Sequence, residues 1–343
     1  MPGISSPVRA VWRLLLFVLW TLVVVPPYST LLGLRLPSRW LARVYWRGTA
    51  AAIGLRIRVA RGRPTKARPL LIVSNHTSYL DIVVLGARLD AGFVAKSEVG
   101  TWPGFGLIAR LGRTVFVERK RASTGKGRDD IARRLAEGEP LILFPEGTSN
   151  DGNRVLPFKS ALLAVAEPPR PRQRRGDTPT STPKPTPPAA PAQAEGESGR
   201  PPLLVQPVSL AYTQVDGLPI GYGLRAHYAW YGDMSLAGHL FAVLGLGNAT
   251  AEVIFHDPVD VAAAGSRKAL ARHCQALISG GVGELLSGHP ALPVPAPGTA
   301  SGTASGASRA TAQPDAAPNA TDPAPDTAPD TAPGARTDAP AAP

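Results

Sequence analysis

PLLIVSNHTSYLD, residues 69–81, joins a short apolar run to a polar turn and the beginning of a helical pattern. The run 69–74 is typical of a strand that is buried on both faces, because its apolar residues do not alternate with polar ones. We expect a turn at 75–78 and a helix at 79–87. A buried strand that leads directly into a helix is the unit from which parallel sheets are built.

The same alternation continues outward from this segment in both directions. Strands are expected at 51–58, 92–95, 113–117, 140–144, 203–212 and 251–255, and helices at 107–111, 129–137, 159–166 and 266–279. Strands that alternate with helices favour an α/β fold with a mainly parallel sheet flanked by helices.

The N-terminal part of the chain is basic and then apolar. Residues 1–80 contain twelve Lys and Arg but no Asp or Glu, and the whole chain has a net charge of +12. The uncharged segment 14–34 is long enough to cross or enter a bilayer. Pro26 and Pro27 interrupt it, so we expect a kinked span or a helix that dips in and returns. A membrane-associated helical segment therefore precedes the α/β domain.

A basic helix is expected directly after the apolar segment. Arg35, Arg39, Arg43 and Arg47 recur every four residues beside Trp and Tyr, a composition typical of a helix at a membrane surface. A solvated helix or a DNA-binding arm would also be basic, but the DNA-binding interpretation leaves the apolar segment unexplained. A cleaved signal peptide lacks its usual small-residue site here.

The distribution of charge also predicts orientation. More Arg follow the apolar segment than precede it, so we expect the chain to lie in the cytoplasmic (inner) membrane with its α/β domain facing the cytoplasm. The single cysteine, Cys274, agrees with a cytoplasmic location and excludes an internal disulfide. The six histidines show no metal-ligand spacing, so no metal site is expected. Nucleic acid is not an expected partner.

Composition divides the chain into three parts. We expect a membrane anchor with its basic amphipathic helix at 1–50 and an α/β domain at 51–289. A Pro-rich insertion at 168–202 and an Ala/Pro-rich tail at 290–343 are expected to be disordered, because neither can bury enough apolar surface to order itself.

The turn after the first buried strand contains a candidate general base. His76 and Asp81 lie where ligands bind in parallel sheets, at the carboxyl end of a strand. A carboxylate on one imidazole nitrogen fixes the tautomer and makes the other nitrogen a better base. A capping Asp and an unrelated surface His would produce the same short pattern.

Three further motifs also follow or include predicted strands. Residues 144–150, FPEGTSN, offer a carboxylate, a close-approach glycine and a hydroxyl to a polar ligand. Residues 112–119, GRTVFVER, end in Arg119, whose guanidinium suits a phosphate. Residues 205–209, VQPVS, are uninformative alone, and the first two motifs alone would fit an ordinary turn and a solvated charged loop.

Together, these four motifs in this order resemble the glycerolipid (lysophospholipid) acyltransferase family, which is typified by bacterial 1-acyl-sn-glycerol-3-phosphate acyltransferases. The family has N-H-x-x-x-x-D, G-x-x-F-x-x-R, F-P-E-G-T and V-x-P-V blocks, and all four are present over roughly residues 70–212. The resemblance implies an N-terminal membrane-bound helical segment ahead of an α/β domain.

The resemblance also implies a role for each motif residue. His76 would remove the proton of an acceptor hydroxyl and Asp81 would orient it, with direct attack on the acyl thioester and no acyl-enzyme. The implied substrate-binding residues are Gly112, Phe116, Arg119, Glu146, Gly147, Thr148 and Lys159. Of these, Arg119 would hold a phosphate, residues 146–148 the glycerol part, and Lys159 a phosphate or the nucleotide of the donor. Backbone N–H groups near His76 are candidate donors to the oxyanion.

The expected activity is therefore O-acyl transfer from acyl-CoA or acyl-carrier-protein to a lysophospholipid. The expected acceptor is 1-acylglycerol-3-phosphate, which would give phosphatidic acid, and lyso-ornithine lipid or another lysolipid is the alternative. Membrane lipids are the other expected partners, and no cofactor is expected. A non-catalytic lipid-binding protein of the same fold would not need His76 or Asp81, and a serine hydrolase would need a G-x-S-x-G motif that is missing.

Overall fold

The computed structural model describes residues 5–36, 38–102, 105–117, 125–166 and 201–297. All of them belong to one compact unit, Met1–Ser301, and a second unit, Gly302–Pro343, lies outside the described residues. The predicted insertion at 168–202 lies outside them apart from 201–202, and the predicted tail apart from 290–297. The predicted boundaries between the three parts of the chain stay predictions.

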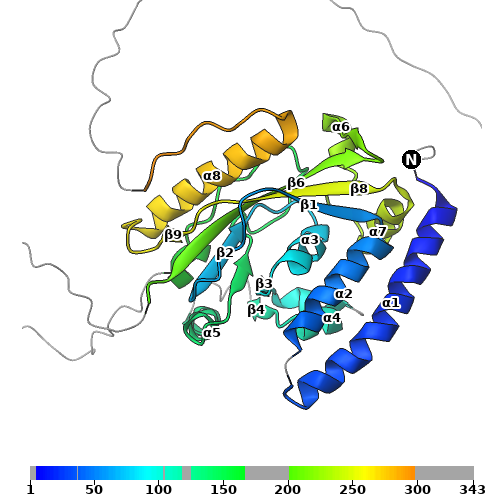
Figure 1. Ribbon diagram of the computed structural model, residues 1–343, viewed down its shortest axis with the longest axis horizontal. Coiled ribbons are helices and arrows are strands. Elements are labelled where there is room, and N and C mark those ends of the chain that lie inside the picture. The colour runs from blue at the N-terminus through cyan, green and yellow to red at the C-terminus, as the bar shows by residue number, and fades with distance from the viewer. Residues whose placement is uncertain (1–4, 37, 103–104, 118–124, 167–200, 298–343) are drawn as a thin grey trace, which may run out of the picture. The chain divides into compact units, whose positions relative to one another are not determined.

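A mixed, mostly parallel sheet forms the centre of the molecule (Figure 1). Its strand order is β1-β8-β6-β2-β5-β3-β4, and only the β6–β8 pair on this path is antiparallel. The strands are β1 (Leu55–Arg61), β2 (Leu70–Ser74), β3 (Gly92–Lys96), β4 (Val115–Val117), β5 (Leu141–Leu143), β6 (Leu204–Val215) and β8 (Ala249–Phe255). Two short strands, β7 (Leu218–Pro219) and β9 (Val259–Asp260), pair with β6. The predicted α/β class is confirmed.

The strand β2, which contains the apolar run expected at 69–74, lies inside the sheet. β2 pairs in parallel with β5 on one side and β6 on the other, and Leu71 is aligned with both Leu141 and Val205. Every residue of β2 is buried. A strand covered on both faces needs apolar residues at consecutive positions, which explains its unbroken apolar run.

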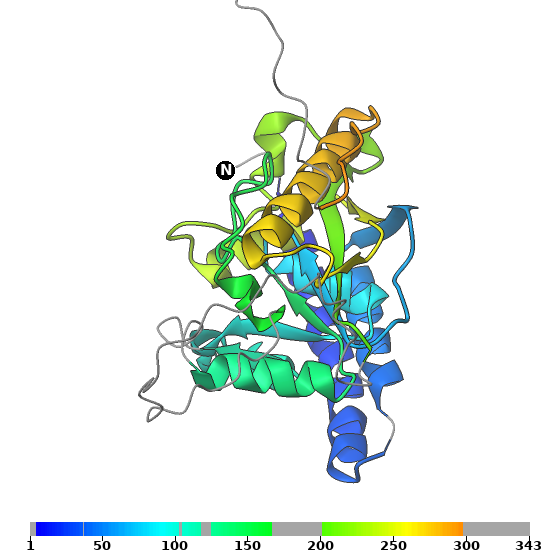
Figure 2. The same ribbon diagram turned by 90° about the vertical axis from the view of Figure 1, so that its left-hand side faces the viewer.

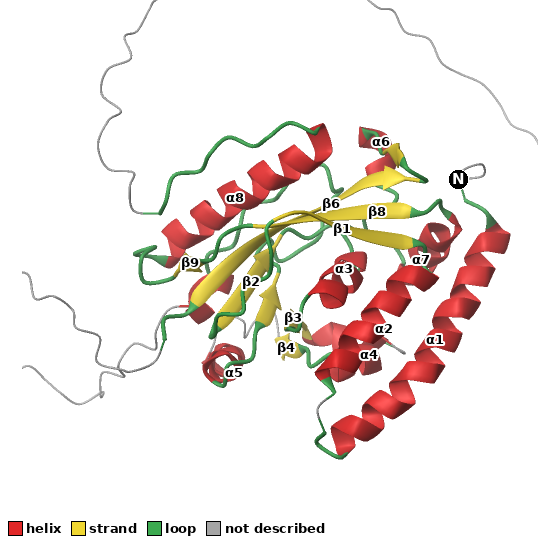
Figure 3. Cartoon of the chain, viewed as in Figure 1, coloured by secondary structure: helices red, strands yellow, loops and turns green. Residues whose placement is uncertain are grey.

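Helices cover both faces of the sheet (Figures 1 and 3). On one face, α3 (Leu80–Arg88) lies on the strands, followed outward by α2 (Arg39–Ala52) and α1 (Pro7–Gly33). On the other face lie α5 (Gly125–Ala136), the 3-10 helix η2 (Leu162–Ala166) and α8 (Arg267–Ser287). Figure 2 shows α8 and α5 from the side. The remaining helices are η1 (Ser97–Thr101), α4 (Phe105–Leu111), α6 (Tyr222–Arg225) and α7 (Leu236–Gly245).

The helix α1 differs from its prediction, because it continues through the two prolines. Pro26 and Pro27 lie inside one continuous helix, so of the two expected forms the helix that dips in and returns is wrong, whereas the span stays a prediction. A proline inside a helix lacks an N–H donor and crowds the carbonyl one turn earlier, but the helix continues here, and Ser29 and Thr30 add side-chain bonds to the carbonyls of Val25 and Pro26. Val24 and Tyr28 hold the same stretch against α2. The helix is long and apolar enough to cross a membrane, with a mean hydropathy of 2.1 and 17% of its most apolar window buried.

The first half of α1 is attached to the α/β domain. The side chain of Arg13 is buried and donates to the carbonyl oxygens of Leu244 and Leu246 at 3.1 and 2.8 Å, and to Asn248 Oδ1 at 2.9 Å. These carbonyls lie at the C-terminal end of α7, where a cation is favoured. α1 therefore packs along the domain rather than projecting from it.

Several other boundaries also differ from the sequence-based expectation, among them the strand expected at 51–58, which begins only at Leu55 because α2 continues to Ala52. Arg35 has a left-handed φ of 55° and precedes α2, so only three of the four expected stripe arginines lie on that helix. The segment expected to be helical at 159–166 forms only the short 3-10 helix η2, because the chain first returns to the 145 turn through a bond from Lys159 N to Pro145 O.

Candidate active site

The candidate site lies between the end of β2 and the beginning of α3. Asn75 fixes this loop to the neighbouring strand, because its amide donates to Leu210 O at 2.8 Å and accepts from Leu210 N at 2.9 Å. The side chain of Asn75 thus completes a two-bond bridge to β6. Asn75 is the first residue of the N-H-x-x-x-x-D motif, but the sequence alone indicates no role for it.

Asp81, in the first turn of α3, is completely buried and accepts four hydrogen bonds. Its Oδ2 lies 2.9 Å from Nδ1 of His76, 2.7 Å from the N–H of Thr77 and 3.0 Å from the N–H of Ser78. Its Oδ1 accepts from the hydroxyl of Tyr212 at 2.8 Å. The structure therefore brings together the His76–Asp81 pair that the spacing predicted.

This arrangement also positions the ring of His76. Because the oxygens of Asp81 already accept three other hydrogen bonds, the geometry fits Nδ1 of His76 as a further donor to Oδ2. The ring stacks on Phe144, with centroids 4.1 Å apart and planes at 17°. The side chain is 22% exposed, and Nε2 has no hydrogen-bond partner among the described residues. The ring of His76 is thus held by Asp81 and Phe144 and stays partly exposed.

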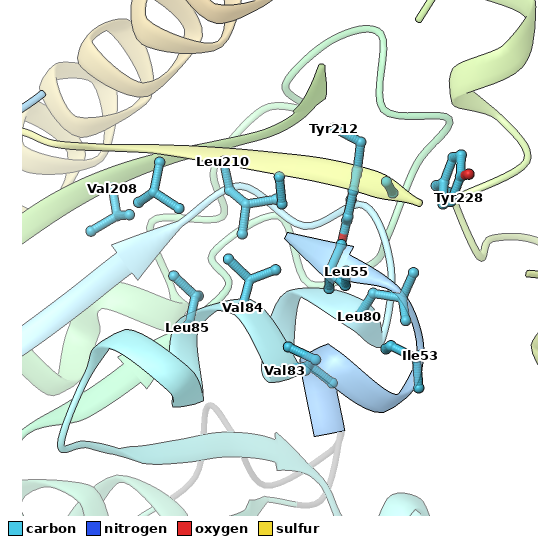
Figure 4. Packing of buried hydrophobic residues seen from close by; sticks show 14 of the residues in the cluster. Ile53, Leu55, Leu80, Val83, Val84, Leu85, Val208, Leu210, Tyr212 and Tyr228 are labelled. Carbon is cyan, nitrogen blue, oxygen red and sulfur yellow. The ribbon is translucent and has the colours of Figure 1, made fainter. Parts of the chain in front are cut away.

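Tyr212 is a site residue that the sequence analysis missed. It extends from β6 toward the start of α3 (Figure 4), is buried, and stacks on Tyr228 with centroids 6.0 Å apart. Burial, together with the charge of Asp81, holds the pKa of Tyr212 well above its usual value, so the phenol stays a donor. Tyr212 lies 131 residues after Asp81 in sequence. A motif search within one loop could not connect the two.

Glu146 is buried and binds the backbone of His76. Its Oε1 accepts from the N–H of His76 at 2.8 Å, and its Oε2 accepts from Asn150 Nδ2 at 2.7 Å and Leu156 N at 3.0 Å. Burial raises the pKa of this carboxyl, against the lowering effect of these donors. Its expected contact with the substrate stays a prediction, and in the structure its oxygens bind the protein's own loops.

The rest of the FPEGT turn presents polar groups next to this carboxylate. Gly147 has a left-handed φ of 68°, and an added Cβ there would lie 2.9 Å from Nζ of Lys159. Thr148 and Lys159 are exposed. The side chain of Lys159 therefore lies against Gly147 of the turn. The substrate contacts expected for Gly147, Thr148 and Lys159 stay predictions.

The residues of the G-x-x-F-x-x-R block, 112–119, lie apart from the His76–Asp81 pair. Gly112 ends α4 and lines a cavity of about 30 Å³ with Leu89, beyond the C-terminal end of α3, whereas His76 precedes its N-terminal end. Phe116 lies on β4, and its ring would be 3.2 Å from an added Cβ at Gly100. Arg119 lies outside the described residues. Their binding roles stay predictions.

The backbone donors near His76 are already used. The N–H groups of His76, Thr77 and Ser78 bind Glu146 or Asp81 in this structure, and the expectation that backbone donors near His76 serve an oxyanion stays a prediction. These bonds hold the loop 76–78 in place.

An aromatic cluster borders the loop on its other side. Tyr79 packs edge-on against Trp230 and His239, and Trp230 packs edge-on against Trp102. The backbone N–H of Trp230 donates to Thr77 O at 3.1 Å, which ties the cluster to the loop 76–78. Of these residues only Tyr79 lies within one of the four sequence motifs.

Comparison with known proteins identifies the family. The family model described as Acyltransferase matches residues 56–172. A lyso-ornithine lipid O-acyltransferase of Rhizobium meliloti is 40% identical over 260 residues, which cover 75% of this chain and 80% of the relative. The chain belongs to the acyltransferase family.

Other relatives of this acyltransferase support the assignment. A lyso-ornithine lipid O-acyltransferase of Brucella abortus is 43% identical over 70% of this chain and 82% of its own. A 1-acyl-sn-glycerol-3-phosphate acyltransferase of Neisseria meningitidis is 33% identical over 35% of this chain and 48% of its own. The crystal structure of the acyltransferase PlsC from Thermotoga maritima shares the fold, with a TM-score of 0.50 and 20% identity over 81% of this chain and 97% of that one.

Proposed function

We propose that this acyltransferase transfers a fatty acyl group to the free hydroxyl of a lysolipid with His76 as general base. Nε2 takes the hydroxyl proton while the oxygen attacks the thioester carbonyl carbon. The C–S bond then breaks, and the proton passes from the imidazolium to the departing thiolate. The ester and a free thiol are the products, and no acyl-enzyme forms. The His76–Asp81 geometry is the observation that carries this proposal.

Both carboxylates have distinct parts in this mechanism. Asp81 holds Nδ1–H and stabilises the imidazolium that forms when Nε2 is protonated. Glu146 fixes the backbone of His76 and so sets the position of the ring. An alcohol is too weak an acid to ionise at neutral pH, and a positioned base typically contributes about 10²–10⁴-fold.

The acceptor we propose is lyso-ornithine lipid. The relatives of that name match most of their own length, 80% and 82%, whereas the 1-acyl-sn-glycerol-3-phosphate acyltransferase of Neisseria meningitidis matches 48% of its length. The second candidate is 1-acylglycerol-3-phosphate, the acceptor favoured by the motifs. Bacterial 1-acyl-sn-glycerol-3-phosphate acyltransferases typify the family that has all four sequence blocks.

The structure supports a membrane-bound enzyme. Most of the apolar stretch of α1 is not buried against the rest of the protein, and the neighbouring helix α2 carries Arg39 and Arg43. We propose that this segment attaches the enzyme to the inner membrane with the α/β domain on the cytoplasmic side. The donor would be acyl-CoA or acyl-carrier-protein, and the motif roles of Arg119 and Lys159, to bind its phosphates or an acceptor phosphate, are part of this proposal. No metal or organic cofactor takes part.

Acceptor choice is tested with the purified full chain in vesicles and a labelled acyl thioester. Lyso-ornithine lipid and 1-acylglycerol-3-phosphate are offered side by side, first with acyl-CoA and then with acyl-carrier-protein. We expect the labelled chain to appear in ornithine lipid at the higher kcat/KM. Preferential labelling of phosphatidic acid would assign the second candidate, and labelling of neither would contradict the proposal.

A further inference from the structure

The helix α7, Leu236–Gly245, is apolar but only partly covered. It contains no Asp, Glu, Lys or Arg. Its last turn, residues 243–245, is buried, whereas Phe241 is 42% exposed and Met234, just before the helix, is 37% exposed. Ala237, Gly238 and Ala242 complete the exposed side. The exposed side of α7 is therefore apolar and carries no Asp, Glu, Lys or Arg within the helix.

This face of α7 adjoins the first turns of α1. Ser5 Oγ donates to Ala242 O at 3.2 Å, and Ser6 N donates to Gly245 O at 2.9 Å. α1 exposes Val8, Val11, Trp12 and Leu15 over the same turns. The two helices lie side by side in Figure 1. Exposed apolar side chains are thus present on both of these contacting helices.

The other side of α7 contacts the candidate active site. His239 Nδ1 lies 3.1 Å from the hydroxyl of Tyr79, and the two rings meet edge-on at 5.7 Å. Tyr79 stands between His76 and Asp81 in the catalytic loop. α7 is therefore an element that joins the apolar surface to the residues around the base.

We propose that α7 is a second membrane-contacting element, which inserts the Phe241 face into the interface of a phospholipid bilayer beside the catalytic loop. The proposal deepens the proposed function, because it rests on membrane attachment through α1. An amphipathic or apolar helix at an interface buries its apolar face about 5–10 Å below the headgroups. With α7 at that depth, a lysolipid hydroxyl at the surface reaches His76 without full extraction of its acyl chain into water.

A probe at position 241 tests the depth directly. The chain has one cysteine, Cys274, which is buried, and burial raises the pKa of its thiol to about 12, so it does not react under mild labelling. Phe241→Cys and, as matched control, Leu292→Cys are labelled in the full chain with an environment-sensitive fluorophore. Leu292 is 87% exposed and follows α8, on the opposite side of the sheet from α1.

Bound to phosphatidylcholine–phosphatidylglycerol vesicles, the label at 241 should be quenched by lipids that carry a nitroxide near the headgroup, at a depth of about 5–10 Å. The label at 292 should instead be quenched by aqueous iodide. Equal iodide access at both positions would overturn the proposal. Because quenching needs no acyl transfer, this result is independent of the acceptor assignment.

A second variant tests the consequence for lipid turnover. Phe241→Asp should lower the rate with vesicle-borne lysolipid about tenfold or more, relative to the rate with a short-chain, water-soluble acceptor. The reason is that the variant puts a charge in place of an aromatic ring whose burial in the bilayer interface favours binding. Leu292→Asp should leave that ratio unchanged. An unchanged ratio in Phe241→Asp would contradict the proposal.

Discussion

Asp81 accepts from four donors, and this arrangement decides what His76 can do. Three of the four donors come from the loop 76–78, and the fourth, Tyr212, comes from β6. Since each donor needs an acceptor lone pair, the carboxylate is fixed in place and the ring of His76 follows it. The position of the His76 ring is therefore a product of the whole network rather than of one pair.

Tyr212→Phe removes one donor from Asp81 while retaining the ring and its stack on Tyr228. We expect kcat to fall with KM little changed, and the free energy of unfolding to fall by about 1.5–3 kcal/mol, because a hydrogen bond to a charged group is lost. Steady-state kinetics and denaturant unfolding measure the two effects. Tyr228→Phe is the control, since its hydroxyl lies 3.4 Å from Gly247 O and not near Asp81. Equal kcat losses in both variants would show that Tyr212 does not position the base.

The residues of the site were predictable to different extents. His76 and Asp81 could be predicted because five residues across a turn bring them together. Tyr212 could not, because its contact depends on how β6 lies beside β2. Glu146 was identified from its motif, but its burial and its bonds to the His76 backbone depend on the fold.

Among the elements, β2 and α8 show why sequence predicts some segments better than others. β2 was predicted to within one residue, because a strand buried on both faces must be apolar throughout. α8 was expected to end at 279 but runs to Ser287, since Gly280, Gly281 and Gly283 weaken the helical pattern. Gly281 is needed there, as an added Cβ would lie 2.3 Å from Ser209 Oγ.

The attachment of α8 to the sheet should depend on pH. Ser209 Oγ donates to Ile278 O at 3.0 Å and lies 2.8 Å from His256 Nε2. Burial, with a further contribution from Arg61, lowers the pKa of His256 from 6.5 to about 4. The unfolded chain therefore binds a proton more readily between these two values, and the free energy of unfolding should decrease as the pH falls from 6.5 toward 4.

His256→Gln keeps a neutral donor for Ser209 and removes this titration. Denaturant unfolding at several pH values should show that the stability advantage of wild type over the variant shrinks as the pH falls from 6.5 toward 4. A difference that stays constant over that window would exclude His256 as the acid-sensitive group.

For the molecule as a whole, the grouping of the apolar and basic helices on one side of the sheet is the important feature. The sequence predicted an apolar and a basic segment, and the structure places both on the same side of the sheet, with α1 and α2 stacked outside α3. The sequence did not predict that α1 packs along the domain, because the buried bonds of Arg13 to α7 involve residues more than 200 positions away.

Arg39 and Arg43 should contribute to binding of anionic membranes. Replacing both with Ala should weaken binding to anionic vesicles roughly 20–30-fold, since each arginine near such a surface contributes about 1 kcal/mol. Vesicle sedimentation at low and high salt measures the change, and added salt should reduce the difference. Neutral vesicles are the control. An equal loss on neutral vesicles would show a structural defect instead.

The central claim is that His76 is the base of a direct acyl transfer. Single-turnover acylation of lyso-ornithine lipid by His76→Ala, compared with wild type in the same vesicles, tests it most directly. We expect a loss of at least about 10²-fold in the rate of transfer, with vesicle binding and thermal unfolding unchanged and no acyl-enzyme trapped in either protein. A variant that transfers at the wild-type rate, or a wild-type enzyme that carries a covalent acyl group, would contradict the account.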